Sequence, residues 1–162
     1  MSTLPPARPA APTRRHFWAS AKTAASPAQV WDLWTDLAAW PDFDPEMQRA
    51  ESPGGRGRLV RLGQRGTGSS GGRALRFAVT HFDPGCSYTF TTDMPLGELH
   101  VHRRLSTLPE GGCELTHEVW FAGLSAPVFA ALIGARFRSA LAGVVPRVAA
   151  LAVDRPVQVH SG

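Results

Sequence analysis

Hydrophobic and polar residues alternate along most of the chain, in short runs separated by turns that contain glycine or proline. Alternation with a period of two is typical of strands that bury one face. The pattern predicts seven strands, at His16–Ala25, Met47–Glu51, Arg58–Arg65, Arg73–Phe82, Cys86–Asp93, Glu98–Thr107 and Cys113–Phe121. Between two of these strands, the Gly66–Gly72 segment is predicted to be a flexible hairpin loop, because it neither opens a helix nor ends as a phosphate-binding loop does.

Helical spacing is found after the first strand and at the end of the chain. Ser26 followed by Pro27 is typical of a helix start, so a helix is expected over Pro27–Leu37, with a short helical turn after Trp40-Pro41. A long helix is predicted from Ala126 to about Val153. Its apolar stripe consists of Phe129, Ile133, Phe137, Val144, Val148 and Leu151. Pro146 is expected to kink or weaken this helix around Gly143–Arg147.

The predicted order is one strand, two helical pieces, a meander of about six strands and one terminal helix. The pattern contains no parallel crossover and no internal repeat, so it favours an α+β fold with an antiparallel sheet. The long amphipathic helix must then bury its apolar stripe against one face of the sheet. If the sheet is curved, a pocket is expected between the sheet and the helix.

The composition is that of one ordinary globular domain. The chain has 162 residues, 43% of them hydrophobic and 19% charged, with 17 Lys and Arg against 13 Asp and Glu. No run reaches about 18 uninterrupted apolar residues, so no integral membrane segment is expected. Cys86 and Cys113 give no disulfide framework, and a cytoplasmic location is the expectation. Residues 1–14 are expected to be a disordered Pro/Ala-rich tail, residues 15–153 the folded domain, and residues 154–162 a flexible tail.

Three segments resemble one known family. Ala25–Pro41 (ASPAQVWDLWTDLAAWP) resembles the opening of the polyketide cyclase/dehydrase and lipid-transport family, which belongs to the START-like, helix-grip (SRPBCC) superfamily. Gly111–Gly123 resembles its last strand and Pro127–Ala150 its terminal helix, although Gly112-Cys113 stands where the family usually has Gly-Thr. The resemblance implies a curved antiparallel sheet of about seven strands wrapped on a long C-terminal helix, with two short helices after strand 1.

Strand parity indicates which side chains face the expected pocket. The apolar set of each strand should face the long helix, which gives a mostly aromatic and aliphatic cavity of the kind that holds small molecules. The expected ligand-binding residues are Trp40, Phe43, Phe77, Val79, His81, Tyr88, Phe90, Thr92, Val119, Phe121, Phe129, Ile133 and Phe137. Trp40 is otherwise a core residue, and His81 is otherwise a strand-end residue beside its turn.

Arg103 and His117 are the two candidate catalytic residues, because parity places both on the apolar face. A guanidinium there needs a carboxylate, a ligand anion or solvent, so Arg103 could anchor a phenolate, enolate or carboxylate. The alternative is an arginine at the wet end of its strand, or a face inverted by a bulge. His117 could act as a general acid or base in a cyclisation, or be a buried histidine held by a backbone carbonyl.

Other charged patterns predict no cofactor and no metal. His100 and His102 have a two-ligand spacing on one strand face, but no third ligand has a matching motif, so a solvated polar face is the better interpretation. The arginines of the region 56–76 lack the exposed aromatic residues of a nucleic-acid platform, so nucleic acid is not an expected partner. A weak contact with an anionic surface and a monomeric or homodimeric state are compatible with the basic composition.

Together these patterns lead to one main functional hypothesis and two alternatives. The main hypothesis is a protein that binds a hydrophobic, aromatic or polyketide-like small molecule, with cyclisation or dehydration catalysed at Arg103 and His117 as its enzymatic form. One alternative is a non-enzymatic lipid or quinone carrier, which needs only apolar walls and an anchor. The other is an interaction module whose interior is filled by its own side chains.

Overall fold

The computed structural model describes residues 4–156. Within this range the chain forms one antiparallel sheet of seven strands, in the order β1-β7-β6-β5-β4-β3-β2. The strands are β1 (His16–Thr23), β2 (Met47–Glu51), β3 (Arg65–Ser70), β4 (Arg73–Asp83), β5 (Ser87–Met94), β6 (Gly97–Thr107) and β7 (Cys113–Gly123). The helices are α1 (Pro27–Thr35), α2 (Trp40–Phe43) and α3 (Ala126–Val153).

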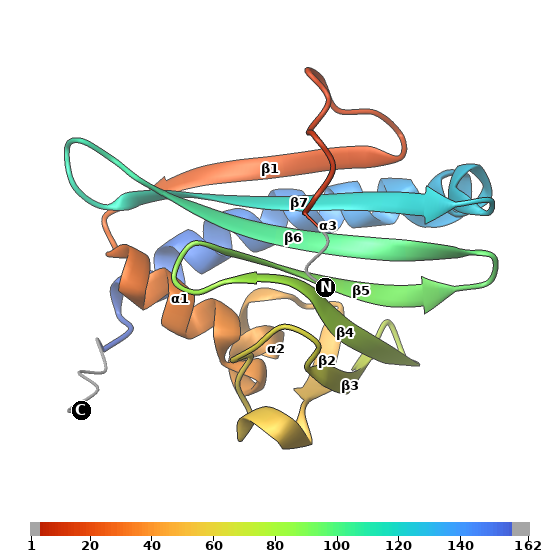
Figure 1. Ribbon diagram of the computed structural model, residues 1–162. Helices are drawn as coiled ribbons and strands as arrows, with labels where there is room; N and C mark the ends of the chain where they lie inside the picture. The colour runs from red at the N-terminus through yellow and green to blue at the C-terminus, as the bar shows by residue number, and fades with distance from the viewer. Residues whose placement is uncertain (1–3, 157–162) are drawn as a thin grey trace.

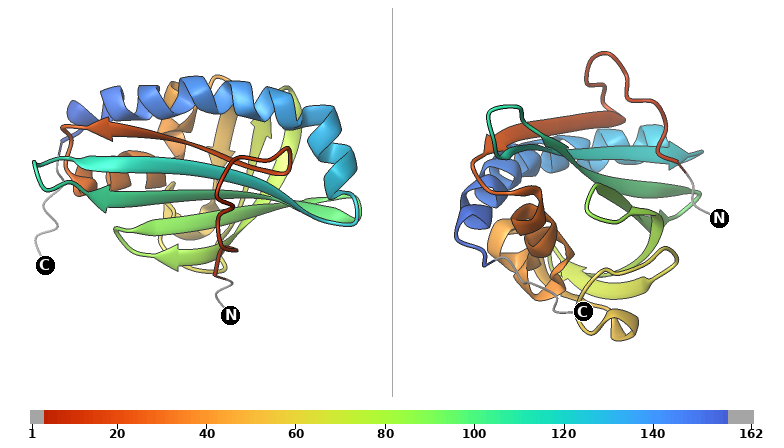
Figure 2. Two further views of the ribbon diagram at one scale, coloured as in Figure 1. Left: turned by 90° about the horizontal axis from the view of Figure 1, so that it is seen from above. Right: turned by 60° about the vertical axis from the view of Figure 1, so that its left-hand side comes forward.

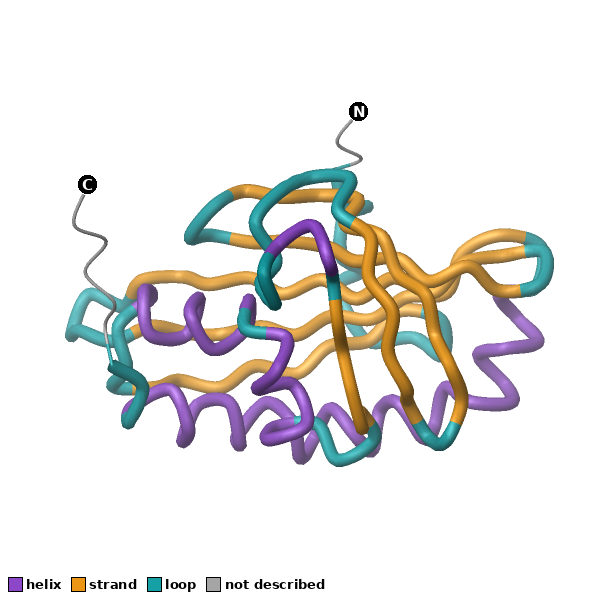
Figure 3. The backbone as a smooth tube through the Cα atoms, turned by 90° about the horizontal axis from the view of Figure 1, so that it is seen from below, coloured by secondary structure: helices purple, strands orange, loops and turns teal. Residues whose placement is uncertain are grey.

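The sheet curves around an interior that the helices close. Figure 2 shows α3 running along the sheet, while α1 and α2 lie against the inner side of the curve. In Figure 1 the same helices lie below and behind the strands, and Figure 3 shows the arrangement from below. This architecture confirms the predicted α+β helix-grip fold, including the two short helices after strand 1.

Helix α1 begins where the sequence predicts, because its N-terminus is capped twice. The Ser26 side chain accepts a hydrogen bond from the Gln29 backbone at 3.2 Å. The Gln29 side chain in turn accepts from the Ser26 backbone at 2.8 Å, which completes a capping box. This reciprocal cap fixes the position at which the chain leaves β1 and turns under the sheet.

Helix α3 is the helix that the sheet grips. By length and composition alone it could cross a membrane, but it packs along β1 and β7 and against α1 and α2, as the core helix of a globular domain does. Its buried side differs in part from the predicted stripe, since Leu141, Val145 and Ala152 are buried while Leu151 is exposed. The helix runs through Pro146 from Ala126 to Val153 as one element.

The predicted strand Arg58–Arg65 is wrong, and most of the predicted Gly66–Gly72 loop is strand β3 instead. Residues 56–64 form a loop around the buried Gln64 amide, which donates to the Arg58 carbonyl at 2.6 Å. The glycines of β3 allow close approach to its neighbours. A Cβ on Gly66 would lie 2.1 Å from Phe77 Cζ, and one on Gly68 would lie 2.4 Å from the Arg49 carbonyl oxygen.

A β-bulge changes the face to which one predicted pocket residue belongs. The register between β4 and β5 shifts between Val79 and His81, so that His81 pairs with Thr89 and Phe82 pairs with Tyr88. The expectation that His81 faces the interior with Phe77 and Val79 is therefore wrong, because the extra residue inverts the alternation. His81 lies on the outer face, where its ring is 5.8 Å from that of His102.

The two predicted tails lie partly outside the described residues. Residues 4–14 cross the outer face of the sheet, as Figure 1 shows for the red segment before β1. At the other end, Arg155 forms ion pairs with Asp32 and Asp36 of the α1 region. Residues 1–3 and 157–162 lie outside the described part, and the disorder expected of the tails stays a prediction.

Candidate ligand-binding site

The inner face of the sheet brings Arg103, His117 and six of the predicted ligand-binding residues into three cross-strand rows. Directly paired residues of neighbouring antiparallel strands share a face, so the register alone defines each row. The rows are Val119–Val101–Phe90–Val79, His117–Arg103–Tyr88–Phe82 and Phe121–Leu99–Thr92. Parity arguments therefore predicted the inner face of β5, β6 and β7 correctly.

Arg103 lies at the centre of these rows inside a box of aromatic rings. Its side chain is buried, with a relative exposure of 2%. The guanidinium carbon is 4.8 Å from the Trp40 ring centroid and 5.2 Å from that of Phe43, both on α2. The rings of Tyr88 and Phe90 lie at 5.8 and 5.6 Å. The positive charge is thus surrounded by electron-rich ring faces, which attract cations.

The hydrogen bonds of Arg103 do not include a carboxylate. Its Nη1 donates to the Tyr88 hydroxyl at 2.6 Å, and that hydroxyl donates to the Trp34 carbonyl at 2.7 Å. The buried Arg103 Nε has no hydrogen-bond partner among the described residues. A buried guanidinium with an unused donor and no carboxylate in direct contact among the described residues is an electrostatic deficit that an anion would relieve.

Two acidic groups near this charge retain their protons more strongly than usual. Burial raises the pKa of Tyr88 above its usual value, although the Arg103 charge and hydrogen bond oppose the rise. Burial also raises the pKa of Asp44, the residue after α2, against the opposing effect of its hydrogen bond from the Glu46 backbone and of Arg103. Burial therefore disfavours negative charge on both groups, and the nearby guanidinium only partly offsets this effect.

His117 lies opposite Arg103 in the β6–β7 register. Burial lowers its pKa well below the usual histidine value, and the positive charges of Arg103 and His102 lower it further. Its buried Nδ1 has no hydrogen-bond partner within residues 4–156. The imidazole is thus neutral near neutral pH and offers one uncommitted ring nitrogen to the interior.

The α3 residues of the site are less buried than the residues on the inner face of the sheet. Phe129, Ile133 and Phe137 of α3 are half-buried, and the Phe137 ring meets that of Phe121 edge-on at 6.2 Å. Leu75, Leu99 and Met94 are also half-buried apolar residues that pack on the core. Between them, the sheet and the N-terminal half of α3 present an apolar wall that the protein covers only in part.

The interior around Arg103 is filled by the protein's own side chains. Trp40 and Phe43 are buried, with exposures of 1% and 0%, and the Trp40 ring packs 5.1 Å from Phe90 and 5.6 Å from Phe77. Two pockets, of about 290 and 250 Å³, are lined by neither Arg103 nor His117. Neither of these pockets reaches the guanidinium, over which Trp40 and Phe43 of α2 are packed.

Sequence reasoning missed two contributors to this site. Phe82 takes the inner position expected for His81 and packs against Trp31, with ring centroids 5.6 Å apart. The Trp34 carbonyl accepts hydrogen bonds from both Tyr88 Oη and Trp40 Nε1, the latter at 2.9 Å. Neither has a sequence signal, because the first depends on a bulge and the second on a main-chain atom at the end of α1.

A sequence profile of the family described as polyketide cyclase / dehydrase and lipid transport matches residues 14–152. The chain belongs to this family. Its curved sheet, gripped helix and apolar inner face are accordingly those of a fold that binds hydrophobic ligands. Searches by sequence found no match among curated proteins.

Solved structures share the fold of this family member at low sequence identity. A hypothetical protein from Helicobacter pylori, jhp0584, superposes with a TM-score of 0.73 at 9% identity, covering 94% of this chain and 96% of that one. The aromatase/cyclase ZhuI from Streptomyces sp. R1128 gives a TM-score of 0.66 at 17% identity, covering 91% and 98%. Ara h 8.0201 gives 0.63 at 14% identity, covering 86% and 98%.

Within residues 4–156, no three His, Cys, Asp or Glu side chains are grouped so as to hold a metal ion. His100 and His102 instead accept or donate hydrogen bonds to hydroxyls of β5. His100 Nδ1 lies 2.8 Å from Thr91 Oγ1, and His102 Nδ1 lies 2.9 Å from Thr89 Oγ1. These contacts tie the imidazoles into the outer face of the sheet.

Proposed function

We propose that this family member binds a hydrophobic, aromatic or polyketide-like small molecule that carries an acidic oxygen, between the sheet and α3. The observation that supports this proposal is the buried Arg103 guanidinium, which has aromatic neighbours, an unused Nε donor and, within residues 4–156, no carboxylate in direct contact. A ligand oxyanion on Nε would supply the missing counter-charge. The half-buried apolar wall of Phe129, Ile133 and Phe137 would hold the rest of the ligand.

Helix α2 is the proposed entrance to this site. It has only four residues, and it carries both Trp40 and Phe43 over the guanidinium. A short element of this kind moves at lower cost than a strand of the sheet, because few backbone hydrogen bonds are lost. Ligand entry would replace the two rings on one side of Arg103 with the ligand's own ring.

The proposal is tested with two probes of similar size, 1-hydroxy-2-naphthoic acid and 2-methoxynaphthalene, titrated by fluorescence and calorimetry. We expect the parent protein to bind the acid at least about tenfold more tightly, because one charge-assisted hydrogen bond is worth about 1.5–3 kcal/mol. Arg103→Met should remove this preference. Arg104→Met is the matched control, since Arg104 is exposed on the opposite face of the same strand, and it should keep the preference. Equal binding of the acid by parent and Arg103→Met would refute the assignment.

Catalysis of cyclisation or dehydration is a second candidate function, favoured by the uncommitted Nδ1 of His117 opposite Arg103. Arg103 would stabilise an enolate, and the neutral imidazole would accept or return the proton. With a synthetic linear poly-β-keto thioester, His117→Gln should lower kcat while leaving affinity for the naphthoic acid unchanged. If no product forms with the parent protein, lipid or quinone binding without turnover is the remaining proposal.

A cytoplasmic location and a monomeric or homodimeric state stay predictions.

A further inference from the structure

The outer face of the sheet is unusually rich in buried aromatic and imidazole side chains. Trp120, His102 and Glu118 have exposures of 7%, 5% and 6%, although they lie on the side opposite the core helix. The Trp120 and His100 rings are stacked, with centroids 5.0 Å apart and planes 7° from parallel. A face that looked onto solvent alone would expose such residues, so something covers them.

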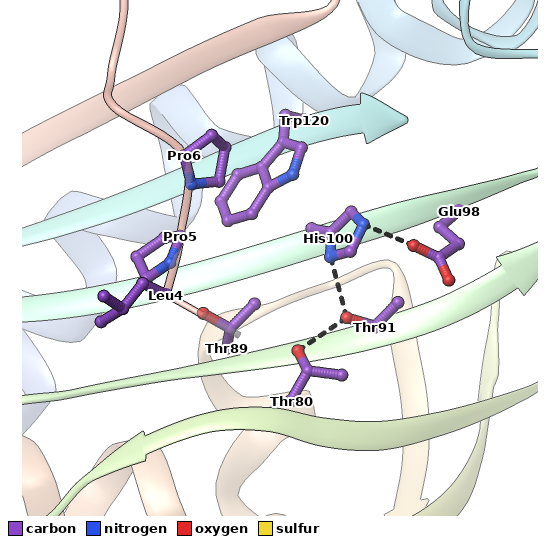
Figure 4. Close-up of a pocket in the computed structure, with 9 residues that line it drawn as sticks. All are labelled: Leu4, Pro5, Pro6, Thr80, Thr89, Thr91, Glu98, His100 and Trp120. Atoms are coloured by element: carbon purple, nitrogen blue, oxygen red, sulfur yellow. Dashed lines mark hydrogen bonds and ion pairs between the residues drawn. The ribbon is translucent and has the colours of Figure 1, made fainter. Parts of the chain in front are cut away.

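His16 of β1 covers part of this face, through contacts with Glu118 and Trp120, and the segment that precedes β1 covers a further part. Residues 4–12 (LPPARPAAP) run across the strands on this face, as both Figure 1 and the left view of Figure 2 show. The guanidinium carbon of Arg8 lies 4.8 Å from the Trp18 ring centroid. Figure 4 shows Pro5 and Pro6 beside the indole of Trp120. The segment thus places prolines and one arginine over the aromatic rings.

The spacing of its prolines matches an extended left-handed helix. Pro6, Pro9 and Pro12 recur every third residue, which is the repeat of polyproline II. In that conformation Pro6 and Pro9 share one edge, whereas the chain bends at Ala10 and Ala11 before it reaches Pro12. Because the prolines restrict the free chain, docking costs less conformational entropy than it would for other sequences.

Both ends of the segment border open space. Leu4, Pro5 and Pro6 line a pocket of about 290 Å³ with His100 and Trp120. Its polar wall is internally paired, since Glu98 Oε2 lies 3.0 Å from His100 Nε2, and His100 Nδ1 lies 2.8 Å from Thr91 Oγ1. A wall whose polar groups are already satisfied suits pyrrolidine rings better than a ligand with many hydrogen-bonding groups.

The other pocket, of about 250 Å³, lies at the far end of the segment. It is lined by Pro12 together with Trp18, Arg138 and apolar residues of β1 and α3. This second pocket therefore lies where the segment passes the edge of β1, on the side of α3, and only the first pocket lies on the outer face.

We propose that the outer face of β1, β7, β6 and β5 is a recognition groove for proline-rich segments that contain an arginine, and that residues 4–12 occupy it in cis. Aromatic-lined grooves recognise polyproline II through ring stacking, and an arginine over an indole adds a cation–π contact. The groove is on the side of the sheet opposite Arg103, so it operates independently of the inner ligand site.

A histidine in the groove reports its occupancy. Burial, followed by the charges of His81 and Arg104, lowers the pKa of His102 to about 4, and the charge of Arg8 in the docked segment lowers it a little further. A hydrogen bond with the Tyr88 backbone acts in the opposite direction. The segment contributes to that burial by covering the face on which His102 lies. Release of the segment should therefore raise the pKa of His102 towards its usual value of about 6.5.

The experiment compares full-length proteins by NMR and fluorescence. One variant combines Pro5→Ala, Pro6→Ala, Arg8→Ala and Pro9→Ala, and the control is Arg14→Ala, an exposed arginine just outside the groove. Each protein is titrated with a synthetic peptide of residues 1–14, and with the same peptide carrying alanine at its prolines. The indole signals of the groove tryptophans and the His102 titration are followed.

We expect the quadruple variant to show a higher His102 pKa than the parent and to bind the proline peptide in trans, with shifted Trp18 and Trp120 signals. A peptide with Arg8→Ala should bind about two- to fivefold more weakly, since it lacks the cation–π contact. The parent and Arg14→Ala should bind the peptide weakly, because the attached segment competes at high effective concentration. Arg103→Met should leave binding of the proline peptide unchanged, which distinguishes this groove from the inner ligand site.

Three results would overturn the proposal. The first is an unchanged His102 pKa in the quadruple variant, and the second is equal binding of the alanine peptide. The third concerns exchange between copies, measured by sedimentation at increasing concentration. A mass that doubles in the parent but not in the quadruple variant would show that the groove binds the segment of a second copy, contradicting occupancy in cis.

Discussion

Arg103 and His117 face each other across neighbouring strands, and the same dry surroundings affect them in opposite ways. A guanidinium cannot release its proton in a protein, so Arg103 keeps its charge and is stabilised by aromatic rings and the Tyr88 hydroxyl. An imidazole can release its proton, and burial beside Arg103 lowers the pKa of His117. Of this pair only Arg103 therefore carries a positive charge, which is the property on which the proposed selection of acidic ligands depends.

The lowered pKa of His117 predicts a loss of stability in acid. The unfolded chain binds the proton below about pH 6.5 whereas the folded protein does not, so the free energy of unfolding falls as the pH drops below that value. Each such histidine contributes at most about 1.4 kcal/mol per pH unit. Urea denaturation at pH 7.5, 6.0 and 5.0 should show a shallower loss for His117→Gln than for the parent. Parallel curves for the two proteins would contradict this expectation.

The hydroxyl of Tyr88 predicts a coupling between two substitutions. Tyr88→Phe leaves Arg103 without its hydroxyl acceptor, so it should lower the free energy of unfolding by about 1–3 kcal/mol. In an Arg103→Met background the hydroxyl no longer serves the guanidinium, and the same change should cost less. A double-mutant cycle by urea denaturation should give a coupling of about 0.5–3 kcal/mol. Additive effects would show that the contact at 2.6 Å contributes little.

At the scale of elements, β3 depends on the absence of side chains. Gly66 and Gly68 allow it to lie against Phe77 and against the Arg49 carbonyl, at separations that a Cβ would violate. The curved half of the sheet, β2 to β4, could not close as tightly with larger residues there. This half carries the buried residues Phe77 and Val79, and the Phe77 ring packs 5.6 Å from that of Trp40.

Alanine at Gly68 should therefore destabilise the protein strongly. Its Cβ would lie 2.4 Å from the Arg49 carbonyl oxygen, which belongs to the backbone and can move only with β2, so a loss of about 2 kcal/mol or more is expected. Gly143→Ala in α3 is the matched control, because nothing lies within 4 Å of its Cβ position. That helix-interior change should stabilise by about 0.5–1 kcal/mol. Thermal unfolding measures both, and a similar shift for the two variants would be inconsistent with this account.

These elements also show how far local patterns determine the structure. Alternation located β1, β2 and β4 to β7 and the inner position of Arg103, because each strand buries one face along its whole length. It failed at β3, where pairing relies on glycines, and at His81, where a bulge inverts the face. The packing of α2 over Arg103 could not be predicted from local patterns either, because it depends on contacts between residues about 60 positions apart in the sequence.

At the scale of the whole molecule, the residue Arg155 connects the C-terminal end of α3 to α1. Arg155, just after α3, forms ion pairs with Asp32 and Asp36, and the Gln29 side chain donates to the Arg155 carbonyl at 2.8 Å. These contacts join α3 to α1, the helix whose Trp34 carbonyl holds Tyr88. A path of direct contacts thus leads from the C-terminal end of α3 to the guanidinium of the inner site.

Arg155→Ala should lower the free energy of unfolding by about 1–2 kcal/mol, because it removes one cation from two carboxylates that are only partly exposed. Arg147→Ala, on an exposed position of α3, is the control and should change stability by less than about 0.5 kcal/mol. The difference between the two variants should shrink in 1 M salt, since ions screen partly exposed pairs. Guanidine cannot be used for this comparison because it is itself a salt, so urea denaturation at low and high salt is the measurement. If both variants lose the same stability, the end of α3 does not fasten α1, and the position of the Trp34 carbonyl must be set by the sheet alone.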